Sequence, residues 1–600
     1  MKRFSLPNIS NWRPWLKTAI ALTLAIILGS CNLSSLETEA AQVSEMVTGT
    51  LSDPSTFNYA LNQEFPHIFL RTYEGLVREN SKTAEVEPAL AESWEVSDNG
   101  LEFVFTLREG LKWSDGEPLT SNDVVFTYND VYLNEEIPTD ARDALRVGES
   151  RAFPKVEKID DLKVKFTLPE SFAPFLGTTE LYVLPEHALR EAVETKNQDG
   201  KPKFLSTWGV DTPPEEIIVN GPYQLVGYQT NQRVIFRRNP FYWRKDEQGN
   251  QLPLIERIVW EIVENTNTSL LQFRSGSLDA VGVTPEFFSL LKKEEERGNF
   301  SIYNAGPAYG QTFISFNLNQ GKRDGKTLVE PFKSRWFNSV EFRRAVAHAI
   351  DRETMVNNIF RGIGEPQNSP ISIQSPFYLS TEEGLPVYDY DLDKSRKLLK
   401  KAGFKYKGSE LFDSEDNRVR FTLITNAGNK IREAMAAQIK QDLSKIGIQV
   451  DFTPIAFNTL VDKLSDSLEW ECYLLGFTGG NEPNSGSNIW NIEGGLHTFN
   501  QKPLPGQSKL EGRKVYDWER EISDLYIQGG KEIDQEKRKE IYGKTQILTQ
   551  EYLPMIHLIN PLALGAVRNH IQGVKYVALP DKFWNIYEIK DNSYKAELTK

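Results

Sequence analysis

The sequence predicts an α/β or α+β protein with several domains, and three observations support this prediction. Short strand-like stretches alternate with helical stretches along the chain, and no internal repeat or low-complexity tract interrupts them. The 600 residues are too many for one hydrophobic core and enough for two to four domains. A content of 39% hydrophobic and 25% charged residues is typical of globular proteins and argues against a disordered or fibrous chain.

The charge balance is acidic, with 83 Asp and Glu against 69 Lys and Arg and a formal net charge of −14. A surface this negative repels phosphate backbones and anionic lipid, so nucleic acid is not an expected partner. The six histidines are scattered and form no pair spaced for one helix face, so the sequence predicts neither a metal site nor a cofactor. No Gly-x-Ser-x-Gly elbow is present to indicate a catalytic serine.

Residues 1–30 are predicted to be a lipoprotein signal peptide. Basic residues precede an apolar run at 19–29, which as a helix would span about 16 Å, short of the roughly 30 Å of a bilayer core. The junction at 28–31 (LGSC) resembles a bacterial lipobox, which implies diacylglycerol attached to Cys31 and a polar tether over 31–43. An ordinary secretory cleavage beside an incidental cysteine is the alternative.

Three strands are predicted from their β-branched and aromatic residues, at 103–107, 164–168 and 256–263. In the third strand, Ile258, Trp260 and Ile262 share one apolar face at a period of two. The same alternation places Phe103 and Phe105 on one face of the first strand, which predicts that both are core residues.

Two helices are predicted in the second half of the chain. The first begins at Asn338, which is expected to cap it, with Glu341 completing a capping box. Its core stripe is Phe342, Ala345, Val346, Ala349 and Ile350. The second runs from about 392 to 402, with Asp391 and Asp393 at its positive end and Gly403 as its stop.

Two motifs that suggest ligand chemistry fail on spacing. The alternating acids at 389–393 resemble a calcium loop, but Lys394 stands where glycine is needed and Lys400 where a bidentate glutamate is needed. The stretch 321–327 imitates a phosphate loop with one residue too few between its glycines.

Turn residues cluster at 211–214, 305–307 and 551–554, which makes these segments candidate domain crossings.

Residues 476–490 (GFTGGNEPNSGSNIW) follow the apolar run 472–475, in which Cys472 is predicted to be a buried, inert thiol. The glycines, asparagines and serines of this segment place it outside the expected core. It is either a plain surface loop or a binding loop on a rigid scaffold.

Several blocks resemble the extracellular solute-binding proteins of family 5, the dipeptide and oligopeptide class that serves ABC importers. The strongest block is PALAESW at 88–94, continued by FVFTLR at 103–108 and KWSDG at 112–116. Further matching blocks follow in family order at 53–54, 73–77, 220–223, 238–243, 275–280, 343–345, 349–352 and 402–404. The resemblance covers nearly the whole chain after the predicted signal peptide.

The resemblance implies a periplasmic binding protein-like α/β fold of class II, with two lobes around a cleft and an extra domain. Domain I would comprise 44–80, 216–306 and 555–600. Domain II would comprise 81–215, and domain III would comprise 307–554.

The resemblance also implies a function without catalysis. A lipid-anchored monomer at the periplasmic or outer face of the cytoplasmic membrane would capture peptides and deliver them to ABC permease subunits. An oligosaccharide or a metal chelate is the alternative ligand. The rival functions are an exported hydrolase acting on peptide or sugar, and a sensor or assembly protein with the same fold.

In dipeptide-binding relatives, the segment that matches 476–480 reads Gly-Trp-Thr-Gly-Asp, and its Asp pairs with the ligand's amino group. Here Phe477 keeps the aromatic platform, Gly480 replaces the carboxylate, and Glu482 is a candidate substitute. The resemblance implies a ligand-facing rim made of Phe477, Thr478, Gly479, Gly480, Asn481, Glu482 and Trp490, with Asn484, Ser485 and Asn488 beside them. The alternative is that these residues only shape the turn. The missing carboxylate argues against a simple dipeptide ligand.

Overall fold

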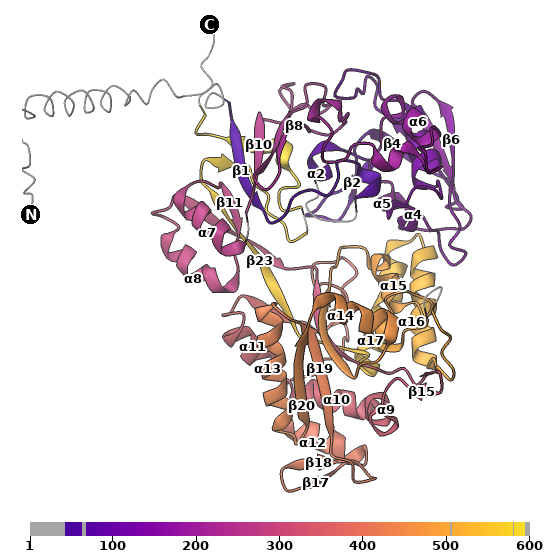
Figure 1. Ribbon diagram of the computed structural model, residues 1–600, viewed down its shortest axis with the longest axis vertical. Helices are drawn as coiled ribbons and strands as arrows, with labels where there is room; N and C mark the ends of the chain where they lie inside the picture. Colours follow the sequence, from indigo (N-terminus) through magenta and orange to yellow (C-terminus); the bar gives the residue numbers. More distant parts are fainter. Residues whose placement is uncertain (1–42, 63–67, 264, 504–506, 580, 595–600) are drawn as a thin grey trace, which may run out of the picture.

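The computed structural model describes residues 43–62, 68–263, 265–503, 507–579 and 581–594, which form two lobes, one above the other in Figure 1. We call residues 43–307 and 559–594 the first lobe and residues 308–558 the second lobe. The predicted signal peptide, the predicted lipidation site Cys31 and the tether up to residue 42 lie outside the described residues. In the described part of the chain, no helix has the length and apolar character needed to cross a membrane.

An eight-stranded mixed sheet forms the centre of the first lobe, in the order β12-β23-β11-β1-β10-β9-β8, with β16, which the second lobe contributes, paired to β23. Its strands are β1 (Glu45–Thr50), β8 (Tyr223–Gln229), β9 (Arg233–Arg238), β10 (Arg257–Ile262), β11 (Ala280–Gly282), β12 (Phe300–Pro307), β16 (Gly364–Pro366) and β23 (Ile559–Arg568). Strand β1 runs parallel to β10 and β11, whereas the other pairings are antiparallel. Helices α7 (Thr266–Ser275) and α8 (Pro285–Glu294) pack against it through Leu270, Phe273 and Leu291.

A second, antiparallel sheet of the first lobe has the order β4-β5-β7-β6. Its strands are β4 (Ala91–Val96), β5 (Glu102–Leu107), β6 (Lys155–Asp160) and β7 (Lys163–Thr167). Strands β5, β7 and β10 confirm the three predicted strands to within one residue at each end. Phe103 and Phe105 share the buried face of β5 as predicted.

The second lobe contains a five-stranded sheet in the order β20-β19-β21-β13-β22. Its strands are β13 (Gln311–Phe316), β19 (Arg420–Asn426), β20 (Gln449–Ile455), β21 (Cys472–Phe477) and β22 (Met555–His557). Helices cover the sheet, among them α10 (Val340–Ala349), α12 (Leu392–Lys401), α13 (Lys430–Ser444), α16 (Asp517–Lys531) and α17 (Gln535–Tyr552). Cys472 is buried in this lobe, and burial raises the pKa of its thiol well above the usual value, as expected of an inert cysteine.

Helix α10 corrects one sequence prediction. Its cap is Ser339, whose hydroxyl accepts the amide hydrogen of Phe342, because Asn338 is taken up as the last residue of helix α9 (Pro331–Asn338). The predicted core stripe of α10 is fully buried. Helix α12 confirms its prediction, since Asp391 caps it and Gly403 follows it with a left-handed φ of 89°.

Two adjacent chain segments connect the lobes. One runs from β12 into β13, and the other runs from β22 into β23. They are fastened side by side, because the Ala308 amide donates to the Pro561 carbonyl at 2.9 Å and the Asn560 Nδ2 donates to the Ala308 carbonyl at 2.6 Å. We call 306–310 and 558–561 the crossing segments.

The crossing segments agree with one predicted crossing and correct another. The predicted crossing at 305–307 coincides with the first crossing segment, where Gly306 has a φ of 81°. The turn at 551–554 is instead the end of α17, with Leu553 in the left-handed region. Because β22 belongs to the second-lobe sheet, the crossing falls near Leu558. The division into three domains remains a proposal, with its boundary at 555 better drawn at 558.

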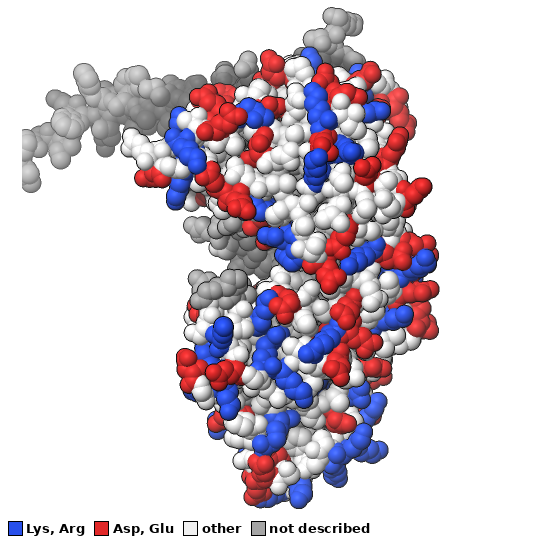
Figure 2. Space-filling view, turned by 90° about the vertical axis from the view of Figure 1, so that its right-hand side faces the viewer, with Lys and Arg blue, Asp and Glu red and all other residues white. Residues whose placement is uncertain are grey.

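Charged residues of both signs are interspersed over the face drawn in Figure 2, and the described residues on that face form no large area of one sign. The surface is indented on one side where the two lobes meet. The outline is therefore that of two lobes that touch along part of their shared boundary.

A buried ion pair joins the amino-terminal and carboxyl-terminal parts of the first-lobe chain. Arg71, in helix α2 (Phe69–Thr72), donates to both carboxylate oxygens of Asp581 at 2.9 Å and 2.7 Å. The side chains are 7% and 18% exposed. Because the two residues are far apart in sequence, this pair fixes the carboxyl-terminal segment to helix α2.

Replacing Asp581 with alanine is expected to lower the free energy of unfolding by about 3–5 kcal/mol, because it leaves a buried guanidinium without its carboxylate. Scanning calorimetry of the whole protein measures the loss. Asp98 is exposed, so the control D98A should stay within about 0.5 kcal/mol of the wild type. A D581A protein that melts with the wild type would contradict the structural role of the pair.

Candidate ligand site between the lobes

The loop after β21 lies against the first crossing segment. A Cβ added to Gly479 would lie 2.0 Å from the carbonyl oxygen of Tyr309, so no larger residue fits there without moving the chain. A Cβ added to Gly480 would meet nothing within 4 Å. Gly479 therefore allows the close approach of the loop to the crossing segment, and Gly480 borders open space.

Asn481 connects this loop to the first lobe. Its side chain is 5% exposed, and its Nδ2 donates to Glu79 Oε1 at 2.7 Å. Its backbone carbonyl accepts a hydrogen bond from the Ser375 hydroxyl at 2.6 Å. Its amide oxygen Oδ1 is buried and has no hydrogen-bond partner among the described residues. Of the predicted rim residues, Asn481 is the one whose side chain bonds directly across the lobe boundary.

Glu482 already has a positively charged partner within its own lobe. Its Oε1 accepts from Arg538 Nη2 at 2.7 Å and from the Asn484 amide at 3.0 Å. The guanidinium of Arg538 is mostly buried and also lies over the Phe377 ring, 4.9 Å from its centroid. Because this carboxylate is committed to Arg538, we do not propose it as the substitute for the carboxylate missing at Gly480.

The position of Trp490 corrects the expectation that it belongs to the ligand-facing rim. It ends helix α15 (Ser487–Trp490), is 2% exposed and stacks on Tyr526 with ring centroids 6.3 Å apart. The end of the predicted loop is thus part of the second-lobe core, because α15 folds down onto α16.

The other predicted rim residues divide between the boundary and the turn. Phe477 is half-buried, with its ring centroid 5.2 Å from that of Phe313, and Thr478 is exposed. The Ser485 hydroxyl donates to the Glu482 carbonyl, and Asn488 Oδ1 accepts from the Gly495 amide, so these two shape the local turn.

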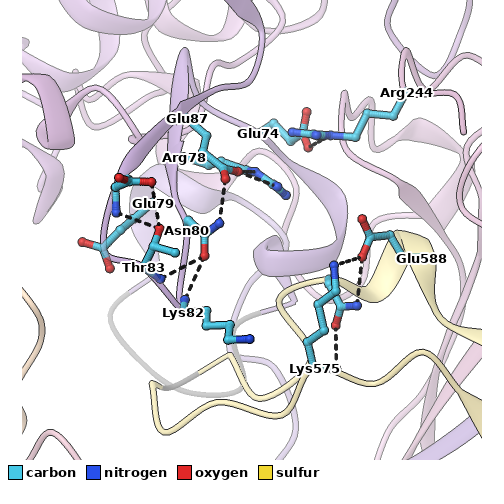
Figure 3. A network of polar contacts seen from close by, with 12 residues as sticks. Glu74, Arg78, Glu79, Asn80, Lys82, Thr83, Glu87, Arg244, Lys575 and Glu588 are labelled. Carbon is cyan, nitrogen blue, oxygen red and sulfur yellow. Dashed lines mark hydrogen bonds and ion pairs between the residues drawn. The ribbon is translucent and has the colours of Figure 1, made fainter. Parts of the chain in front are cut away.

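Two carboxylates of the first lobe lie next to Asn481. Glu79 ends β2 (Val77–Glu79), and its amide donates to Glu180 Oε1 at 3.3 Å. Neither carboxylate forms an ion pair with a Lys or Arg of the described chain. Figure 3 shows that Arg78 points to the opposite side of the β2–β3 hairpin, where it pairs with Glu87 of β3 (Val86–Pro88) at 2.8 Å.

Their surroundings raise the pKa of both carboxyls. Solvent reaches Glu180, but desolvation by the surrounding protein, together with the negative charge of Glu79, raises its pKa to about 7. Desolvation also raises the pKa of Glu79, and the negative charge of Glu482 adds to this effect. Tyr309 is 8% exposed, and desolvation together with the charge of Glu79 raises its pKa to about 12. The site is thus electronegative, with Tyr309 buried, Glu79 partly buried and Glu180 exposed to solvent.

A second set of contacts closes the lobes on each other away from this site. Lys531, the last residue of α16, pairs with Glu149 at 3.1 Å and with Glu170 at 3.0 Å. Its carbonyl accepts from the Ser171 hydroxyl at 3.0 Å, and the Ala173 amide donates to the Gly530 carbonyl at 2.8 Å. We call Lys531, Glu149 and Glu170 the interlobe latch.

A separate cavity of about 500 Å³ lies within the first lobe, with mainly apolar walls. Residues of β1, β10, β11 and β23 line it, together with the Arg71–Asp581 pair. Because all of its lining residues belong to one lobe, closing the lobes would not assemble it, and we assign it no ligand.

Sequence reasoning found one half of the interlobe site and missed the other. It selected the loop at 477–482 but not Glu79, Glu180 or Lys531. Glu79 follows the resembling block at 73–77 by two residues, which was an available indication. No local pattern marks Glu180 or Lys531, whose roles depend on which segments face each other across the lobes.

The comparisons with known proteins agree with this architecture. The family model described as bacterial extracellular solute-binding proteins, family 5 (middle) matches residues 85–496. A "Probable ABC transporter-binding protein" of Deinococcus radiodurans is 29% identical over 87% of this chain and 88% of its own length.

Two solved structures share the fold. The oligopeptide-binding protein AppA of Bacillus subtilis, in complex with a nonapeptide, aligns with a TM-score of 0.67 and 22% identity over 92% of this chain and 99% of its own. The periplasmic binding protein MelB of Agrobacterium fabrum, in complex with stachyose, aligns with a TM-score of 0.70 and 20% identity over 93% and 86%.

The two neighbouring glycines give a matched test of the loop. The substitution G479A is expected to lower the free energy of unfolding by about 1–3 kcal/mol, because its Cβ clashes with the crossing segment. The control G480A places its Cβ in open space and should leave the melting temperature unchanged. Thermal unfolding followed by circular dichroism measures both, and equal melting temperatures for the two variants would contradict the packing described.

Proposed function

Because the chain belongs to family 5 of the bacterial extracellular solute-binding proteins, we propose that it captures peptides between its two lobes and delivers them to a membrane permease. Members of this family bind solutes and are not catalysts. The protein is the substrate-binding component of an ABC importer and works outside the cytoplasm, in the periplasm or at the cell surface. ATP hydrolysis is the task of other subunits of such an importer.

The observation that carries the proposal is the hydrogen bond between Asn481 and Glu79, made across the lobes beside the crossing segments. A solute held there touches both lobes only when they are closed. It therefore shifts the population toward the closed form, by as much as its affinity for the two forms differs. A permease that distinguishes the closed form would then accept loaded protein in preference to empty protein.

Peptide is the proposed ligand class, supported by the nonapeptide in AppA. An oligosaccharide is the second candidate, favoured by the stachyose bound to MelB. A metal chelate is a third alternative. Within the described residues, no group of three or more His, Cys, Asp and Glu side chains is arranged to hold a metal ion directly.

Mass spectrometry of solutes that co-purify with the protein tests the ligand class, followed by calorimetry with the solute identified. A peptide present at about 100 times its Kd should stabilise the protein by about 2.7 kcal/mol. Recovery of sugar alone, with no heat from any peptide, would overturn the peptide assignment.

The interlobe latch predicts a measurable contribution to closure. Replacing Lys531 with alanine should raise the Kd for the identified ligand about 2- to 5-fold, because exposed ion pairs contribute at most about 1 kcal/mol. Lys539 pairs with Glu383 inside the second lobe at 3.4 Å, so the control K539A should leave the Kd unchanged. Titration calorimetry of both variants decides whether the latch favours the closed form.

We also propose that Cys31 carries the lipid anchor. The substitution C31S should release the protein from membranes into the soluble fraction and abolish incorporation of labelled palmitate. Cys472, buried in the second lobe, supplies the control: C472S should remain anchored and labelled. A wild-type protein that is soluble and takes up no labelled palmitate would indicate ordinary secretory cleavage instead.

A further inference from the structure

Glu79 and Glu180 place two carboxyl groups near each other at the lobe boundary, and no Lys or Arg of the described residues forms an ion pair with either of them. The Glu79 amide lies 3.3 Å from Glu180 Oε1, and within the described chain neither acid has a Lys or Arg partner. Arg78, the adjacent arginine, is engaged by Glu87, and Arg538 is engaged by Glu482. The negative charge of Glu79 acts on Glu180, and the positive charge of Arg78 offsets it only in part. A further positive charge between the two carboxylates would therefore stabilise both.

A separate observation indicates that a hydrogen-bond donor belongs in the same place. Asn481 is 5% exposed, and its Nδ2 is fixed by Glu79, so its amide group lies directly at the acidic pair. Its Oδ1 is buried and accepts no hydrogen bond from the described residues. A buried amide oxygen without a donor is costly, about 1–3 kcal/mol in typical proteins, which makes it unusual in a finished site.

We propose that Glu79, Glu180 and Asn481 form a site for a positively charged nitrogen group of the solute, an ammonium or a guanidinium. This inference rests on the proposed function and specifies the chemistry of the solute. The three acceptors come from two lobes, so the cation would be enclosed between them as the lobes close. It would neutralise the acidic pair and supply the donor that Asn481 Oδ1 lacks.

The groups beside the proposed site are open to solvent, so a solute could extend beyond its cation there. Gly480 borders open space, Thr478 is exposed, and solvent reaches Glu180. Glu79 and Glu180 also supply the negative charge that the loop lacks at Gly480. In this arrangement the second lobe provides the amide, and the first lobe provides the carboxylates.

Four tetrapeptides of equal length test the inference and separate the two sources of the cation. They are Ala-Met-Ala-Ala and Ala-Lys-Ala-Ala, each with a free or an acetylated amino terminus. Spermidine and arginine serve as cations that are not peptides. Titration calorimetry with the full protein is expected to show binding of the cationic peptides at least about 10-fold tighter than binding of acetyl-Ala-Met-Ala-Ala.

The variant E79Q/E180Q removes the charges and keeps the shape, and it should reduce this preference to less than about 2-fold. The control E157Q/E493Q removes the same charge from carboxylates at the surface, whose partners are Lys155 and Lys502, and should keep the full preference. If the double variant does not fold, E180Q alone replaces it, because Glu180 is already exposed to solvent.

The outcomes test the cation site and the peptide assignment separately. A preference that follows the free amino terminus identifies the terminal ammonium as the bound cation, and one that follows lysine identifies a basic side chain. Binding of spermidine or arginine without any peptide supports the cation site and overturns the peptide assignment. Equal binding of all four peptides, no binding of any cationic probe, or an unchanged preference in E79Q/E180Q overturns the cation site.

Discussion

The rest of the structure depends on the pair of hydrogen bonds that fastens the two crossing segments, between Ala308 and Pro561 and between Asn560 and Ala308. They hold β23 beside the end of β12, which is its neighbour in the first-lobe sheet. Since both connections run side by side, a change of a few backbone angles at this place reorients one lobe against the other.

The candidate site is built directly on this connection. Gly479 allows the loop after β21 to rest on the Tyr309 carbonyl, so the loop and the crossing segment have to move together. Asn481, two residues further on, then reaches the first lobe. The position of the loop next to the hinge, rather than its composition, makes it a place where a bound solute and lobe closure affect each other.

Charge organises the boundary between the lobes in two opposite ways. At the interlobe latch, Lys531 compensates two glutamates from the other lobe, which favours contact with or without a solute. At Glu79 and Glu180, no Lys or Arg of the described residues forms an ion pair with either carboxylate, and desolvation raises the pKa of both. The first arrangement is complete in itself, whereas the second is complementary to a cation that the described chain does not supply.

The sequence by itself determined the fold class, three strands, the apolar stripe of α10 and the family, because these depend on local periodicity and on contiguous blocks. It placed the cap of α10 one residue early, and it put Trp490 at the surface, because neither the end of α9 nor the packing of α15 is visible in local composition. Only the tertiary structure decided that Glu482 is bound by Arg538 and that Glu79, Glu180 and Asn481 meet. Residues this far apart in sequence become neighbours through the packing of two lobes, and no local pattern encodes that contact.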